Sequence, residues 1–102
     1  MKLLDKITTL EHDAAAFGFQ WENTDQLMAQ IHSECLEITE HLKSTQETDR
    51  AALQEEIGDL LHAVFSLCVF CNMDPEETLQ GTLEKFERRL QAVKAIAKEQ
   101  QL

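Results

Sequence analysis

Acidic residues occur in pairs, three positions apart, in two segments that otherwise have the pattern of amphipathic helices. Glu34 and Glu37 form the first pair, and Glu56 and Asp59 form the second. On a helical wheel of about 100° per residue, Glu34 falls inside the apolar stripe of its segment and Glu37 lies at the edge of that stripe. An ionised carboxylate is costly to bury unless it is paired with another charge or bound to a metal ion. Glu34 is therefore a candidate for either arrangement.

The second pair repeats this placement, with Glu56 on the shoulder of an apolar line and Asp59 one step farther round. If the two segments are antiparallel neighbouring helices, all four carboxylates face one another. Converging oxygen ligands suit a hard cation such as Mg²⁺, with Mn²⁺ as a possible substitute. The alternative is that Glu34 is a partly buried acid paired with His41 or with Lys85 of a later helix.

Basic residues follow in the last third of the chain. Lys85 and Arg89 lie along one shoulder of the apolar stripe of their segment. Cations beside a bound metal ion stabilise the charge that develops on a polyphosphate, so the combination favours phosphoryl-type hydrolysis. The alternative is that both side chains are solvated charges extending from a helix shoulder.

The elements that position these residues are predicted to be helices. The 102 residues include one Pro, three Gly and no Tyr, and no alternating strand pattern is present. Asn23 followed by Gln26, and Asp74 followed by Pro75, are typical helix starts. We expect an all-α fold in a single domain, 1–102, with helices at about 2–16, 24–43, 50–71 and 75–98.

Composition limits the partners. The formal net charge of −10 disfavours nucleic acid and anionic membranes. The apolar run 60–73 is shorter than the roughly 20 residues that a membrane span needs. Three cysteines, an odd number without a secretory signal, predict a reduced, cytoplasmic setting. A chain of this length buries only about two thirds of its unfolded surface, so oligomerisation is expected.

Three short motifs together resemble those of the MazG-like nucleotide pyrophosphohydrolases. They are SECLE at 33–37, EIGD at 56–59 and KFERR at 85–89, and the resemblance extends from Trp21 to Arg89. The family pattern is Glu-Glu-x-x-Glu followed by Glu-x-x-Asp, with a later Lys-Phe and an Arg. Ser33 stands where the family usually has its first Glu, and Leu83 where an Asn often precedes the Lys-Phe.

The resemblance implies a four-helix, MazG-like bundle completed by oligomerisation, as a homodimer or a homotetramer. It also implies hydrolysis of nucleoside or deoxynucleoside triphosphates to the monophosphate and pyrophosphate, often to remove unwanted nucleotides. The resemblance implies that Mg²⁺ is held by Glu34, Glu37, Glu56 and Asp59. It implies further that Lys85 and Arg89 bind the substrate phosphates and that Trp21 stacks on the base. For Trp21, an aromatic residue of the core or of an interface is the alternative.

Two other classes of function are left open. Asp59-x-x-His62 supplies one imperfect copy of the motif of a di-metal carboxylate bundle, which binds iron or acts as an oxidase. The wheel places His62 opposite the core line, where solvent or a subunit contact is expected. Cys68 and Cys71 have the spacing of a metal or redox site but are predicted to be core thiols. A non-enzymatic acidic helical interaction module is the last alternative, and it leaves the position of Glu34 unexplained.

Overall fold

The computed structural model describes residues 2–44 and 49–101, which form four α-helices joined by short connections. The helices are α1 (Leu3–Ala16), α2 (Thr24–Lys43), α3 (Arg50–Phe70) and α4 (Pro75–Gln100). The described residues contain no strand, so the prediction of an all-α fold is confirmed. The observed helix bounds lie within two residues of the expected ones.

Two helices start at the side-chain caps that the sequence predicts. The side chain of Asn23 accepts a hydrogen bond from the backbone N–H of Gln26 at 2.8 Å. The side chain of Gln26 in turn accepts one from the backbone N–H of Glu22 at 2.9 Å. At the start of α4, the carboxylate of Asp74 accepts from the backbone N–H of Glu77 at 3.0 Å. These bonds pair backbone donors that the first turn of a helix leaves free, and so fix where α2 and α4 begin.

Two helices end in left-handed turns that redirect the chain. Gly18, after α1, has φ +81°, and the N–H of Phe19 bonds to the carbonyl of Ala14 at 2.9 Å. Asn72, after α3, has φ +60° and is followed by the same pattern of bonds. Both are Schellman turns, in which glycine is favoured and asparagine is tolerated. The second turn sends α4 away from α3 at a bend of 109°.

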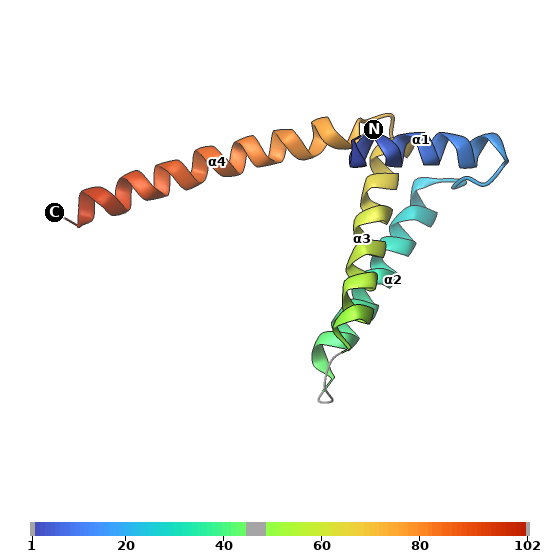
Figure 1. Cartoon of the computed structure of the whole chain (residues 1–102), viewed down its shortest axis with the longest axis horizontal. Coiled ribbons are helices and arrows are strands. Elements are labelled where there is room, and N and C mark those ends of the chain that lie inside the picture. Colours follow the sequence, from blue (N-terminus) through green and yellow to red (C-terminus); the bar gives the residue numbers. More distant parts are fainter. Residues whose placement is uncertain (1, 45–48, 102) are drawn as a thin grey trace.

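The centre of the fold is an antiparallel hairpin of α2 and α3, with α1 packed across the end of α3 (Figure 1). Leu27 of α2 and Leu53 and Ala63 of α3 are its buried apolar side chains. α4 contacts α1 and α3 near the bend but does not contact α2. An ion pair at 3.7 Å between Lys2 and Glu76 joins the start of α1 to the start of α4.

Most of α4 extends into solvent as a single helix (Figure 1). Pro75 is its only buried residue among those described, and the apolar stripe is open, with Leu83 54% and Phe86 61% exposed. The radius of gyration is 18.1 Å, compared with about 13 Å for a compact domain of this length. The accessible surface is 8381 Å², compared with about 5,900 Å² for a compact monomer of this size. The chain therefore exposes surface that a compact protein buries.

Within the described ranges, no single helix is both long enough and apolar enough to cross a membrane. α3 and α4 reach that length and composition only as a pair, with the 109° bend between them.

Candidate metal centre

The pairing of α2 with α3 brings acids from both helices together. One carboxylate oxygen each from Glu34, Glu56 and Asp59 lies within 4.8 Å of the other two. Glu34 is buried, with 7% of its surface exposed, whereas Glu56 is half-buried and Asp59 is exposed. Glu34 occupies this position because it belongs to the stripe by which α2 packs on α3. The group is thus anchored in the core at one end and open to solvent at the other.

Two oxygens of this group are buried without a hydrogen-bond partner. Glu34 accepts a bond from Nε2 of Gln30 on Oε1, at 2.8 Å, but its Oε2 has no partner. Oε2 of Glu56 is in the same state. A buried oxygen without a hydrogen-bond partner lowers the stability of the fold, and several anionic oxygens side by side lower it further. Three carboxylates with unused oxygens are the donor set that Mg²⁺ or Mn²⁺ takes in proteins, so these residues fit such an ion.

Neighbouring acids also change the acidity of Glu56. The pKa of the Glu56 carboxyl is raised to about 7, first by the adjacent carboxylate of Glu37, which favours the protonated form, then by burial and by the carboxylate of Glu34, and by the negative charges of both. The protonated form of Glu56 can donate to a neighbouring carboxylate, which the ionised form cannot do. A divalent cation would remove the repulsion that the proton relieves.

Glu37 lies beside the three-oxygen group and is not part of it. It is exposed, and its link to the group is its effect on Glu56, whose pKa it raises more than any other neighbour does. Glu37 and Glu56 also line a small pocket of about 250 Å³ that neither Glu34 nor Asp59 reaches. Ser33 is exposed on α2. The structure therefore brings three of the four predicted ligands into one cluster and places the fourth next to Glu56.

A larger pocket, of about 730 Å³, adjoins the metal centre. Glu34 and Asp59 line it, together with residues from the end of α1, the connector 17–23 and the first half of α2. Trp21 is half-buried in its wall. Ligand pockets of about 300–1,000 Å³ hold small molecules of nucleotide size. Two of the four acids predicted to bind metal, Glu34 and Asp59, thus face the same cavity as Trp21, the residue predicted to stack on a base.

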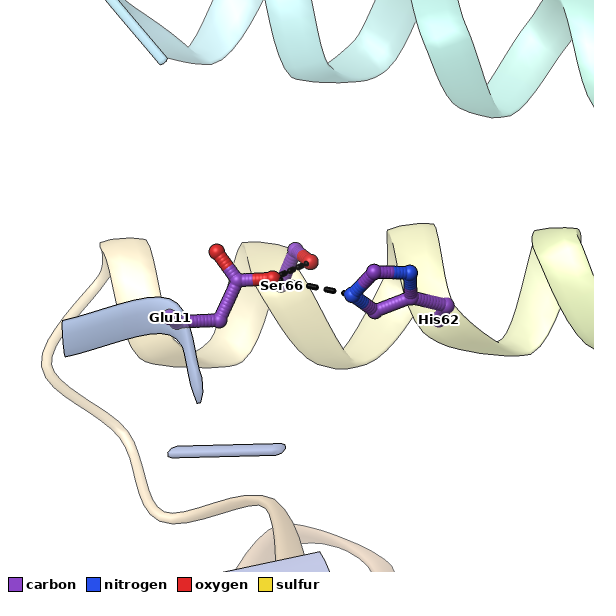
Figure 2. Close-up of polar contacts among 3 residues, drawn as sticks. All are labelled: Glu11, His62 and Ser66. Carbon is purple, nitrogen blue, oxygen red and sulfur yellow. Dashed lines mark hydrogen bonds and ion pairs between the residues drawn. The ribbon is translucent and has the colours of Figure 1, made fainter. Parts of the chain in front are cut away.

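The pocket also holds Glu11 of α1 and Ser66 of α3, which the sequence did not point to, and His62 of α3, which it suggested only as a ligand of a di-metal bundle. Figure 2 shows them converging, with Oε1 of Glu11 3.0 Å from Nε2 of His62 and 2.5 Å from Oγ of Ser66. We call these residues the Glu11 cluster. His62 and Ser66 are four residues apart and share a helix face. Glu11 is more than 50 residues away in the chain, so no local pattern connects it to them.

The predicted phosphate-binding cations lie elsewhere in the chain. Lys85 and Arg89 are exposed on α4, a helix that extends away from the hairpin (Figure 1) and does not contact α2. Within one copy of the chain, the described structure does not bring them to the acids.

The features that suggested other metal sites do not converge on the acids. Nε2 of His62 faces Glu11, and among the described residues the group that could hold a metal ion contains carboxylates only. Cys68 is half-buried and Cys71 is exposed, and both are free thiols. Cys71 therefore differs from the core thiol expected, because it follows the last turn of α3.

The geometry agrees with the comparison to known families. The profile of the MazG nucleotide pyrophosphohydrolase domain matches residues 22–94. The chain belongs to the MazG family. The matched region contains both acid pairs of this MazG chain and its Lys85 and Arg89, and it starts one residue after Trp21.

Curated MazG relatives match over most of the chain. It is 30% identical, over 87 residues, to the nucleoside triphosphate pyrophosphohydrolase/pyrophosphatase MazG of Thermotoga maritima, covering 85% of this chain and 32% of that protein. It is 32% identical, over 87 residues, to the nucleoside triphosphate pyrophosphohydrolase of Escherichia coli K12. That match covers 85% of this chain and 33% of the Escherichia coli protein. The chain therefore spans about a third of the length of these MazG relatives.

Proposed function

We propose that this chain is a Mg²⁺-dependent pyrophosphohydrolase, which converts a nucleoside or deoxynucleoside triphosphate and water to the monophosphate and pyrophosphate. The observation that carries the proposal is the group of three carboxylate oxygens within 4.8 Å at the edge of a pocket of about 730 Å³. Membership of the MazG family and the names of the relatives support this reaction.

Glu34, Glu56 and Asp59 are the residues that would hold the ion. Bound there, Mg²⁺ supplies Lewis-acid polarisation and neutralises the charge of phosphate oxygens. Glu37 lies beside Glu56 and is the first cause of its raised pKa. Because Asp59 is the exposed member of the group, the phosphates approach from its side.

The nucleoside then occupies the adjoining pocket. With the phosphates at Glu34 and Asp59, the sugar and base extend toward Trp21, whose ring offers an apolar face for a base. Attack of water on the α-phosphorus breaks the bond to the bridging oxygen of the β-phosphate and releases pyrophosphate. A carboxylate outside the three that would hold the ion accepts the proton of the water.

We assign the phosphate-binding role to Lys85 and Arg89 of a second copy. The chain exposes roughly 2,500 Å² more than a compact monomer of its size, and permanent interfaces bury about 2,000–5,000 Å² in total. The open apolar stripe of α4 carries Lys85 and Arg89 on its shoulder, so covering this stripe with a second copy brings the cations to a neighbouring hairpin. The assembly is a homodimer or a homotetramer.

A cytoplasmic role in removing unwanted nucleotides remains part of the proposal. The chemistry of the site is consistent with it, because hydrolysis to the monophosphate takes a nucleotide out of the triphosphate pool. The reduced thiols expected from the cysteine count agree with that compartment.

The test is an assay of the purified chain with a panel of ribo- and deoxynucleoside triphosphates, with Mg²⁺ and with a chelator. We expect pyrophosphate and monophosphate in equal amounts, only with the metal. Glu34→Gln should abolish turnover with the helical circular dichroism unchanged, whereas Glu55→Gln, at an exposed position of α3 outside the group, should not. Release of orthophosphate alone, or turnover that does not depend on metal, would contradict the proposal.

A further inference from the structure

The Glu11 cluster occupies the pocket but has no part in the proposed phosphate chemistry. Asp59, His62 and Ser66 all line the pocket from α3. With a rise of about 1.5 Å per residue, Ser66 lies about 10 Å along the helix axis from Asp59. On the same scale His62 lies about 4.5 Å from Asp59, so the cluster begins beside the acid group, and its Ser66 end lies about the length of a nucleoside away.

Glu11 is an acid held in a defined position. Its side chain is only 20% exposed, and Ser66, which donates to it, is almost completely buried. Both contacts use Oε1, and Figure 2 shows the second oxygen pointing away from His62 and Ser66. Glu11 thus has a carboxylate oxygen that its two partners leave unused, and it lies in the wall of the pocket.

The chemistry of a carboxylate decides which ligand it selects. An ionised carboxylate only accepts hydrogen bonds, so it pairs with N–H groups and repels carbonyl oxygens. The exocyclic amino groups of cytosine, adenine and guanine are such donors. Uracil, thymine and hypoxanthine carry a carbonyl oxygen in place of an amino group. That oxygen and the carboxylate of Glu11 are both acceptors, so they would repel each other.

We propose that Glu11, held by His62 and Ser66, is the hydrogen-bond acceptor that selects nucleotides whose base carries an exocyclic amino group. The inference rests on the proposed function for the orientation of the nucleotide, with its phosphates at the acids. Glu11 contacts the base, and His62 and Ser66 are positioning residues that act through Glu11.

The first measurement does not depend on catalysis. Trp21 is the only tryptophan of the chain and lies in the wall of the same pocket, so its fluorescence reports on occupancy. Two pairs of probes differ by an amino group against a carbonyl: dCMP with dUMP, and dAMP with dIMP. We expect the amino member of at least one pair to bind about tenfold or more tightly, the lower end of what one specific base contact contributes.

Three variants test whether Glu11 is the source of the preference for amino-bearing bases. Glu11→Gln should reduce the amino-to-carbonyl affinity ratio to near one, because an amide can turn its NH₂ group toward a carbonyl. Ser66→Ala should lower the ratio by a smaller factor. Asp13→Asn, an exposed acid of α1 that does not line the pocket, makes the same change of charge and should leave the ratio unchanged.

The outcomes separate this inference from the proposed function. Equal ratios in the native chain and Glu11→Gln, with both folded by circular dichroism, would overturn it. The inference would also be overturned if Glu11→Gln changed only the preference between ribose and deoxyribose, because Glu11 would then contact a sugar hydroxyl. Pyrophosphate release from triphosphates, with equal affinities of the native chain for the amino and the carbonyl probes of both pairs, would overturn the inference and leave the proposed function standing. Selective binding of the amino probes without hydrolysis of any triphosphate would support the inference and contradict the proposed function.

Discussion

Gln30 donates a hydrogen bond from Nε2 to Oε1 of Glu34 at 2.8 Å, and so fixes which oxygen of Glu34 is left for the centre of the acid group. The two residues are one helical turn apart on α2, and both line the pocket. The bond holds the buried carboxylate in one rotamer.

Replacing Gln30 by Leu should therefore weaken metal binding. Partners that orient a metal ligand typically contribute about 10–100-fold in metal affinity, and we expect a loss of Mg²⁺ affinity in this range. Titration calorimetry with Mg²⁺ alone measures it. Gln54→Leu, an exposed position of α3 outside the pocket, is the matched control. Equal affinities in the two variants would show that Gln30 does not orient Glu34.

The stability of the metal-free chain should fall as the pH rises through the range in which Glu56 loses its proton. The native pKa is raised from 4.5 to about 7, so between these values the native state binds a proton that the unfolded state has released. The contribution of Glu56 is therefore most favourable below about pH 4.5, decreases with rising pH, and is lost above about pH 7.

Urea unfolding in a chelator at pH 5 and pH 8, on the native chain and Glu56→Gln, isolates this contribution. Glutamine stays neutral, so the variant should lose less stability than the native chain between the two pH values. An identical pH dependence in both proteins would rule out Glu56 as the titrating group.

The open stripe of α4 should be an interface between copies. Leu83→Asp places a charge at a position that is 54% exposed in the single chain. The charge should therefore change the stability of a monomer little, but it should weaken an assembly in which the position is buried. We expect light scattering to show a homodimer or homotetramer for the native chain and dissociation for the variant. Gln91→Asp, at an exposed polar position of the same helix, should leave the assembly intact. A native chain that is monomeric at micromolar concentration would refute this interface.

If Lys85 and Arg89 act on the acids of another copy, two inactive variants should complement each other. Glu34→Gln lacks the metal centre and Arg89→Ala lacks a cation, but a mixed assembly contains one site with both. We expect each variant alone to show little pyrophosphate release and the mixture, after dissociation and reassembly, to regain a measurable part. Mixing Glu34→Gln with Asp59→Asn should restore nothing, because both changes affect the same hairpin.

The helices and the acid cluster could be predicted because their signals are local. The caps at Asn23 and Asp74 are set by residues three positions away, and helical periodicity alone places Glu34 in the stripe that faces α3. Two acid pairs with the same spacing converge once α2 and α3 pair as neighbours.

The Glu11 cluster and the direction of α4 could not be predicted in this way. Glu11 meets His62 and Ser66 only because α1 crosses the end of α3, a tertiary contact that leaves no trace in the spacing of residues. The course of α4 is set by the left-handed backbone of Asn72, whose direction a pattern of hydrophobic residues does not encode. Lys85 and Arg89 were predicted on a helix shoulder, and the helix that carries them extends away from the hairpin of its own chain (Figure 1).

The acid group lies entirely on α2 and α3, whereas part of the pocket wall comes from α1 and the connector 17–23. The carboxylates belong to α2 and α3, within the region matched by the MazG profile, whereas Glu11 and its neighbours on α1 precede that region. Residues of α1 can therefore be exchanged without altering any of the three converging oxygens. A library of chains that differ only in 3–21 would vary the surface presented to a nucleoside while the hydrolytic apparatus stayed the same, which makes α1 a natural cassette for engineering altered substrate preference.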